Sequence, residues 1–405
     1  MADQPMISAT KNELSLFVFI DALGWEIFSE HGLCEQDWQT AGPLESVLGY
    51  SCTCDPTILT GEMPDRHRHF SFFFKQADAS PFRWLTGLQW LPDRLINRGR
   101  VRHHLSKLIA KLHGYDGYFQ LYETPFEVLP YFDYMEKRDI YQPGGILGGQ
   151  PTVFDELRDR SLPFSLSDWR KGEPANFARL ERDLRTERPG FAYLYLAGLD
   201  GILHAEGTTS PRVKEHIRWY EQQLGRILNV AESNYDAVRV YLFSDHGMTD
   251  VSSTIDIMAR LAPLGLRFGK DYVAYFDSTM ARFWFEHDQA ANRIHACLAE
   301  AAGGHWLTQS ELTDYRVDFD DKRYGESIFL CDPGVLIVPS FMGKKPLKGM
   351  HGYDPRHKDS LATFASTELI AQPPRRLDDL HGVMMNEICK ASSAPRQLES
   401  AGARS

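Results

Sequence analysis

The sequence predicts an α/β fold with a mostly parallel central sheet and helices on both of its faces. Three short apolar runs, rich in Val, Leu, Phe and Tyr, each end at an acidic residue: 16–20 before Asp21, 191–199 before Asp200, and 238–244 before Asp245. Strands that are apolar throughout are typical of sheets buried on both faces. A helical stripe occupies residues 211–232, and Ser210 is its expected start. Strands that alternate with helices indicate a parallel arrangement.

This alternation breaks between residues 65 and 185, where aromatic residues are dense and basic residues gather around 94–111. We therefore expect an α/β core made of residues 12–64 and 186–390, with residues 65–185 inserted as an aromatic-rich cap. The aromatic residues are expected mainly to form the core of that cap, and a substrate-facing lid is the alternative. Residues 391–405, rich in Ser, Ala and Arg, are expected to form a disordered tail.

The composition excludes several classes of protein. The chain has 405 residues, 43% of them hydrophobic, which excludes a collagen-like fibre, a disordered protein and a disulfide miniprotein. The formal charge of −11 disfavours nucleic acid and anionic membranes as partners. No apolar stretch approaches the roughly 18 residues of a membrane span, and no secretory signal is recognisable. Six scattered cysteines lack the spacing of a zinc knuckle, so reduced thiols in the cytoplasm are expected. The sequence assigns no oligomeric state.

Candidate functional residues stand where the apolar runs end. In open parallel sheets, ligands bind beyond the carboxyl ends of the strands, and Asp21, Asp200 and Asp245 are all expected there. Histidines accompany two of these carboxylates and follow a later apolar run at 335–339: His204, His246 and His351. His351 lies between two glycines, Gly349 and Gly352, which would let the backbone pass close to a bound group.

Three carboxylates and three imidazoles are enough ligands for two divalent metal ions. Mixed oxygen and nitrogen ligands suit Zn²⁺, or Mn²⁺ in an oxygen-rich site, better than Ca²⁺ or Mg²⁺. A single Asp of this kind is more commonly a turn or capping residue, and a single His more commonly belongs to the surface or the core. Six such residues at strand ends and glycine-lined turns favour a binuclear site, which usually serves displacement at phosphorus or sulfur.

A nucleophile for that reaction is expected near a helix N-terminus, where backbone amides can hold an anion. The segment 49–61 offers three hydroxyl side chains ahead of or within a helical turn: Ser51, Thr53 and Thr57. Coordination to a divalent ion lowers the pKa of a hydroxyl and makes it a nucleophile. Helix capping is the alternative role for each of them.

Taken in order, these residues resemble the alkaline phosphatase superfamily, and most closely its type I phosphodiesterase / nucleotide pyrophosphatase family. The resemblance runs from Asp21 to Asp354 and thus covers most of the chain. It is carried by Asp21, by a hydroxyl residue ahead of Leu-Thr60-Gly61, by Asp200-x-x-x-His204, by Asp245-His246-Gly247 and by Gly349-x-His351-Gly352-Tyr353-Asp354.

The resemblance implies one zinc ion held by Asp200, His204 and His351, and a second held by Asp21, Asp245 and His246. It also implies that Ser51, nine positions before Thr60, is the nucleophile and either bridges the two ions or binds the second. Thr53 is the second candidate, because it stands where the family has a proline. The Asn that helps the family bind phosphate has no clear equivalent, and the resemblance assigns no residue to substrate binding.

The expected function is hydrolysis of a small phosphorylated substrate by double displacement at Ser51. The aromatic insert favours diesters or pyrophosphates, whereas Lys344 and Lys345 could supply the positive charge that a monoester needs. A phosphomonoesterase or phosphomutase of the same superfamily is the alternative activity. An alternative of another class is a non-catalytic, metal-stabilised protein that binds a phosphorylated ligand. A sulfatase is disfavoured because the Cys/Ser-x-Pro-x-Arg motif is missing after Ser51.

Overall fold

The computed structural model describes residues 12–34, 37–76, 78–90 and 99–393. Its central sheet has six strands in the order β2-β16-β7-β1-β6-β5. These strands are β1 (Glu13–Ile20), β2 (Thr40–Leu44), β5 (Phe164–Leu166), β6 (Phe191–Leu196), β7 (Ala237–Phe243) and β16 (Ala362–Ser366). Strands β5, β6, β1 and β7 run parallel, and β16 pairs antiparallel with both β7 and β2. The prediction of an α/β fold with a mostly parallel central sheet is confirmed.

Helices cover both faces of this sheet, because side chains of alternate strand residues point to opposite faces. Leu16 and Val18 of β1 pack in one cluster with helices α1 (Trp25–His31), α7 (Glu173–Thr186), α8 (Gly198–Glu206) and α9 (Pro211–Asn234). Phe17 and Phe19 pack in another cluster with α2 (Ser51–Thr60), α6 (Val153–Asp159) and α13 (Asp379–Ser393). The sheet is therefore buried on both sides, which explains why its strands are apolar throughout.

The predicted helix over residues 211–232 is α9, which continues to Asn234. The Ser210 hydroxyl accepts a hydrogen bond from the backbone N–H of Arg212, and Pro211 occupies the first turn. Proline suits that position because its missing N–H has no helical partner there. Val213, Ile217 and the later residues of the same stripe are buried against the sheet.

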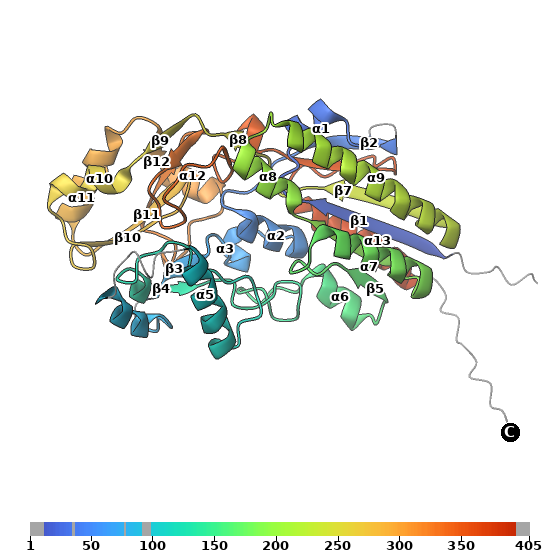
Figure 1. Ribbon diagram of the computed structural model, residues 1–405, viewed down its shortest axis with the longest axis horizontal. Coiled ribbons are helices and arrows are strands. Elements are labelled where there is room, and N and C mark those ends of the chain that lie inside the picture. Colours follow the sequence, from blue (N-terminus) through green and yellow to red (C-terminus); the bar gives the residue numbers. More distant parts are fainter. Residues whose placement is uncertain (1–11, 35–36, 77, 91–98, 394–405) are drawn as a thin grey trace, which may run out of the picture.

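A second lobe lies beside one end of the central sheet (Figure 1). It is built on an antiparallel sheet in the order β10-β11-β13-β12, comprising β10 (Tyr272–Phe276), β11 (Met280–Phe285), β12 (Gly304–Trp306) and β13 (Ser327–Cys331). Three short pairs complete the strands: β3 (Phe73–Lys75) with β4 (Phe132–Tyr134), β8 (Thr249–Asp250) with β15 (Gly349–Met350), and β9 (Ser253–Ile255) with β14 (Val335–Ile337). The apolar runs of the sequence did not predict this second sheet.

The remaining helices are short, apart from α5 and α11. The α-helices are α3 (Pro64–His67), α5 (Gly99–His113), α10 (Ile257–Leu261), α11 (Asp288–Ala299) and α12 (Gln309–Asp314). The 3₁₀ helices are η2 (Arg83–Trp90), η3 (Leu129–Tyr131), η4 (Ala262–Leu264) and η5 (Lys358–Ser360). None of the helices in the described part of the chain is both long and apolar enough to cross a bilayer.

Most aromatic residues between 70 and 134 share one core with the antiparallel sheet, whereas Tyr141, Phe154 and Phe177 pack in the clusters of the central sheet. Phe73 stacks on Tyr275 with 5.0 Å between the ring centroids. Arg282 is fully buried, where its Nε lies 2.7 Å from Asp277 Oδ2 and its Nη1 donates to the carbonyl of Phe73. These aromatic side chains are thus mostly core, and they hold the segment to the later sheet.

The division of the chain at residues 65 and 185 stays a prediction. Strand β5, which lies inside that range, pairs with β6 of the central sheet. The predicted tail falls outside the described residues, except for 391–393, which complete helix α13.

Candidate metal centre and active site

Two neighbouring parallel strands bring the first group of candidate ligands together. Asp21 follows β1 directly, and Asp245 and His246 come shortly after β7. Because β1 and β7 pair in parallel, their carboxyl ends meet at one edge of the sheet. The backbone N–H of Ala22 donates to Asp245 Oδ1 at 3.1 Å, which fixes the two strand ends to each other.

The second group is assembled differently from the way the sequence suggested. Strand β6 ends at Leu196, so Asp200 is not a strand-end residue but lies in the first turn of α8. His204 follows one helical turn later and therefore shares its face. His351 follows β15, whose partner β8 begins shortly after His246. This short pairing, rather than the apolar run at 335–339, brings the third histidine to the site.

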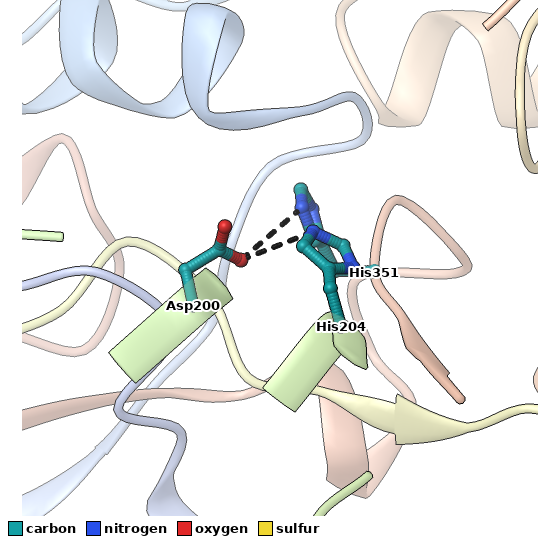
Figure 2. A group of neighbouring side chains, drawn as sticks. All are labelled: Asp200, His204 and His351. Atoms are coloured by element: carbon teal, nitrogen blue, oxygen red, sulfur yellow. Dashed lines mark ion pairs between the residues drawn. The ribbon is translucent and has the colours of Figure 1, made fainter. Parts of the chain in front are cut away.

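Asp200, His204 and His351 form a three-residue cluster (Figure 2). His204 Nε2 lies 3.2 Å from Asp200 Oδ1, and His351 Nε2 lies 3.8 Å from the same oxygen. The three ligand atoms all lie within 4.8 Å of one another. A divalent ion with nitrogen and oxygen ligands about 2.0–2.2 Å away would fit among atoms so spaced.

Asp21, Asp245 and His246 form the second cluster, which is wholly buried. His246 Nε2 lies 3.0 Å from Asp245 Oδ2 and 3.7 Å from Asp21 Oδ1. The two clusters adjoin each other, because the rings of His246 and His351 stack with their centroids 3.7 Å apart. The structure thus brings the six predicted ligands together in two adjoining clusters.

Hydrogen bonds orient two of the imidazole rings. His204 Nδ1 lies 2.9 Å from the carbonyl of Gly349, and His246 Nδ1 lies 2.9 Å from the carbonyl of Gly247. A carbonyl only accepts, so each Nδ1 must donate, and each neutral ring turns the Nε2 lone pair toward a carboxylate. Two acceptors that face each other need a cation or a proton between them. This is the arrangement of histidines that ligate a metal through Nε2.

One oxygen of each carboxylate in the two clusters lacks a hydrogen-bond donor. Asp21 Oδ1, Asp200 Oδ1 and Asp245 Oδ2 are buried and have no hydrogen-bond donor among the described residues. Burial, and after it the negative charges of Asp245 and Asp200, raise the pKa of Asp21 well above its ordinary value. Such groups are costly unless a positive charge neutralises them. The donor set therefore fits two divalent cations.

Ser51 is the first residue of α2 and borders the second cluster. Its Oγ lies 3.1 Å from His246 Nε2. Thr53 is fully buried instead, and its hydroxyl donates to the carbonyl of Phe70 at 2.6 Å. The Thr57 hydroxyl bonds to the carbonyl of Thr53 and contacts His67. Of the three hydroxyl candidates, only Ser51 faces the candidate metal centre.

Gly352, beside His351, has a left-handed backbone with φ +86°. A Cβ atom there would lie 2.8 Å from Cε1 of Tyr50. We expected this glycine to let the backbone approach a bound group, but its close neighbour is a protein side chain. Tyr50 in turn bonds through its hydroxyl to Thr279 and packs its ring edge against His351. Sequence reasoning missed Tyr50, which no motif marks.

A cavity of about 430 Å³ opens beside Ser51, Asp200 and His351. The sequence assigned no residue to substrate binding, and the fold supplies a wall of aromatic and acidic side chains: Asp55, Phe72, Tyr118, Tyr122, Glu136, Tyr141, Trp169 and Tyr195. Most of these wall residues belong to the segment 65–185. The density of aromatic residues in that segment was the one feature of the sequence that could have predicted a substrate wall there. Lys344 and Lys345, which the sequence offered as a source of positive charge, are exposed and do not line the cavity. Lys344 Nζ lies 3.7 Å from Glu123 Oε2.

The fold is similar to solved structures of one group of enzymes. For human ectonucleotide pyrophosphatase / phosphodiesterase 5, the TM-score is 0.66 and the identity 14%, over 95% of this chain and 96% of that one. The murine protein of the same name gives the same values. An inactive variant of the murine protein in complex with AMP gives a TM-score of 0.64 over the same shares of both chains, also at 14% identity.

At this level of identity the likeness shows the fold alone, and no curated protein matches the chain by sequence. The family model described as type I phosphodiesterase / nucleotide pyrophosphatase matches residues 41–354, which is most of the chain. The chain therefore belongs to the type I phosphodiesterase / nucleotide pyrophosphatase family and is a hydrolase of phosphoric ester bonds.

Proposed function

We propose that this enzyme hydrolyses small phosphodiesters through a phosphoryl-Ser51 intermediate, with two divalent cations, foremost Zn²⁺, held by the two clusters. The observation that carries the proposal is the position of Ser51 Oγ, 3.1 Å from a histidine of one cluster and at the edge of the cavity. A nucleophile, a ligand set for two cations and a space for substrate thus adjoin one another.

Asp200, His204 and His351 would hold one cation, and Asp21, Asp245, His246 and Ser51 the other. When bound, such ions lower the pKa of a coordinated hydroxyl and neutralise charge on phosphoryl oxygens. The Ser51 oxygen forms a bond to phosphorus while the bond from phosphorus to the leaving oxygen breaks and an alcohol departs. A water molecule then attacks phosphoryl-Ser51, which restores the serine and releases a phosphate monoester.

The N-terminus of α2 supports this role of Ser51. Backbone N–H groups in the first turn of a helix have no helical acceptor, and the helix dipole favours negative charge there. A transferring phosphoryl group at Ser51 would lie at this end of the helix. Ser51 therefore combines a nucleophile with an anion-binding position.

The walls of the cavity favour a diester over a monoester. A monoester dianion needs positive side chains, and none of the described residues that line the cavity is Lys or Arg. A diester carries one negative charge less and adds a second substituent, which aromatic walls can cover. AMP, bound in the inactive murine variant, is a phosphate monoester, which is the class of product that hydrolysis of a diester would leave.

The test is hydrolysis of a chromogenic diester, bis(4-nitrophenyl) phosphate, by chelated enzyme before and after addition of Zn²⁺ or Mn²⁺. We expect chelation to abolish turnover and the metal to restore it, with 4-nitrophenyl phosphate a poorer substrate. Faster turnover of the monoester would favour the phosphomonoesterase alternative. Metal binding without turnover of any phosphate ester would favour the non-catalytic alternative.

We also propose that the enzyme works in the cytoplasm. All six cysteines are free thiols, the state that a reducing compartment maintains. Fractionation of the native cells tests this location directly.

A further inference from the structure

Helix α5 is attached to the second lobe by one of its sides. Arg102, Ser106 and Ile109 are buried there, and Arg102 Nη1 donates to the carbonyl of Thr124 at 2.9 Å. These residues are three to four positions apart, so they form one side of the helix. The rest of α5 faces away from the lobe, at the outer edge of the molecule (Figure 1).

Another side of α5 exposes a row of apolar side chains. Val101, Leu108 and Leu112 are 39%, 51% and 68% exposed, and they are three of the eight large hydrophobic side chains that are exposed in the described structure. They stand seven and four positions apart, so they lie on one side of the helix. Single exposed apolar residues are normal on a protein surface. A row of them on one helix indicates a contact outside this chain.

A row of cationic side chains runs beside the apolar row. Arg100, Lys107 and Lys111 are exposed, and none of them forms an ion pair with another described residue. Each stands one position before a residue of the apolar row, so the two rows are parallel on the helix surface. Residues 99–113 contain no Asp or Glu, although the whole chain carries a formal charge of −11. This helix is therefore a local exception to the acidic character of the protein.

We propose that these two rows of α5 bind the surface of a membrane that contains anionic lipids. Helices that lie in the membrane interface combine an apolar side, which enters the boundary of the acyl chains, with Lys and Arg, which meet the anionic headgroups. The net charge of the chain, for which we disfavoured anionic membranes, does not determine this contact. Charges on the rest of the surface are screened beyond about 8 Å at physiological ionic strength.

A second copy of the chain fits the two rows less well. A twofold dimer through α5 would bring the same cationic side chains of both copies together, and like charges repel. Three apolar side chains also cover much less than the roughly 800 Å² that each partner buries in a stable interface. A lipid surface needs no complementary shape, and its headgroups carry the charge that the cationic row lacks. The charges therefore favour a membrane over a second copy.

The test is sedimentation of the full chain with vesicles of two compositions, phosphatidylcholine alone and phosphatidylcholine with about one third phosphatidylserine. We expect binding to the anionic vesicles, release from them in about 0.5 M NaCl, and little binding to the neutral ones. Lys107→Gln combined with Lys111→Gln should lower the partition coefficient by at least about tenfold, because each cation near the surface contributes. Leu108→Gln combined with Leu112→Gln should lower it by a similar factor of about ten, because the apolar row no longer enters the boundary.

Lys214→Gln combined with Arg218→Gln is the matched control. These two residues are also exposed and one helical turn apart, on α9, and the variant loses the same charge. Urea unfolding of all variants should match that of the parent, since only exposed side chains change. Absence of binding to anionic vesicles, or equal binding by the lysine variant and the control, would overturn the inference and leave the proposed hydrolase activity untouched. A dimer of the parent that the double leucine variant dissociates would assign the apolar row to a second copy and would also overturn it.

Discussion

Ser51 Oγ lies 3.1 Å from Nε2 of His246, and His246 Nδ1 is committed to the carbonyl of Gly247. The serine hydroxyl must therefore donate to Nε2 when neither a metal nor a proton occupies that nitrogen. Replacing Ser51 by Ala should lower kcat by more than about 10³-fold, because the hydroxyls of the other two candidates, Thr53 and Thr57, are bonded inside the protein and do not face the metal centre. Mass spectrometry of enzyme quenched during diester turnover should lose the Ser51 peptide that carries the phosphoryl group with its remaining ester substituent, while the metal content stays nearly unchanged.

The matched variant is Thr53→Ala, which removes the second candidate hydroxyl. Thr53 donates to the Phe70 carbonyl inside the protein, so this change should cost about 1–2 kcal/mol of stability and preserve the phosphoenzyme. Normal turnover by Ser51→Ala together with an inactive but folded Thr53→Ala would transfer the role to Thr53.

Metal content is the direct test of the two clusters. His204→Ala and His246→Ala each remove a nitrogen ligand from a different cluster, so each should bind about one metal equivalent less than the parent enzyme. Elemental analysis after dialysis gives the ratio, and His305→Ala is the control, because His305 is half-exposed and pairs with Glu311. A full metal complement in both cluster variants would contradict the assignment.

Much of the candidate site could be predicted because its residues carry local signals. Asp21 and Asp245 end buried runs on adjacent parallel strands, so the fold class alone brings them together. Asp200 shows the limit of that reasoning. Residues 197–199 continue the apolar run of β6, but they already belong to the loop and the first turn of α8. A run of apolar residues does not show where a strand ends and a helix begins.

The substrate wall had no such signal. Asp55 and Glu136 are single acidic residues 81 positions apart, and only the folded chain places them in one cavity. The antiparallel sheet was missed for a related reason: β11 pairs with β13 across more than 40 residues that include α11, β12 and α12. Pairing over such a distance depends on packing rather than on periodicity.

Gly352→Ala should loosen the support of His351. The position has φ +86°, and the added Cβ would meet Tyr50 Cε1 at 2.8 Å and the carbonyl of Gly49 at 2.9 Å. We expect the free energy of unfolding to fall by about 1–3 kcal/mol, as judged by denaturant titration, and kcat/KM to fall with it. Gly382→Ala is the control: it lies inside α13 with open space around it and should gain about 0.5–1 kcal/mol. Equal effects of the two substitutions would refute the steric argument.

His69 should make the stability of the enzyme depend on pH. The ring is fully buried and accepts the backbone N–H of Leu147 through Nε2, and burial lowers its pKa to about 3. The unfolded chain binds a proton at about pH 6.5, so it holds more protons than the folded chain between these values. Stability should therefore fall as the pH drops below about 6.5, by up to about 1.4 kcal/mol per pH unit for this group.

Glu, Asp and other His residues titrate in the same range, so the test is a difference between variants. His69→Gln keeps an acceptor for the Leu147 N–H but cannot bind the proton, and the slope of its unfolding free energy between pH 6.5 and 4.5 should be shallower than that of the parent protein. His103→Gln, an exposed position on α5, should leave the slope unchanged. Both series are measured by urea titration with chelator present, so that loss of metal at low pH does not contribute. Parallel slopes for His69→Gln and the parent would mean that His69 is protonated in the folded protein, and that its burial does not hold it neutral.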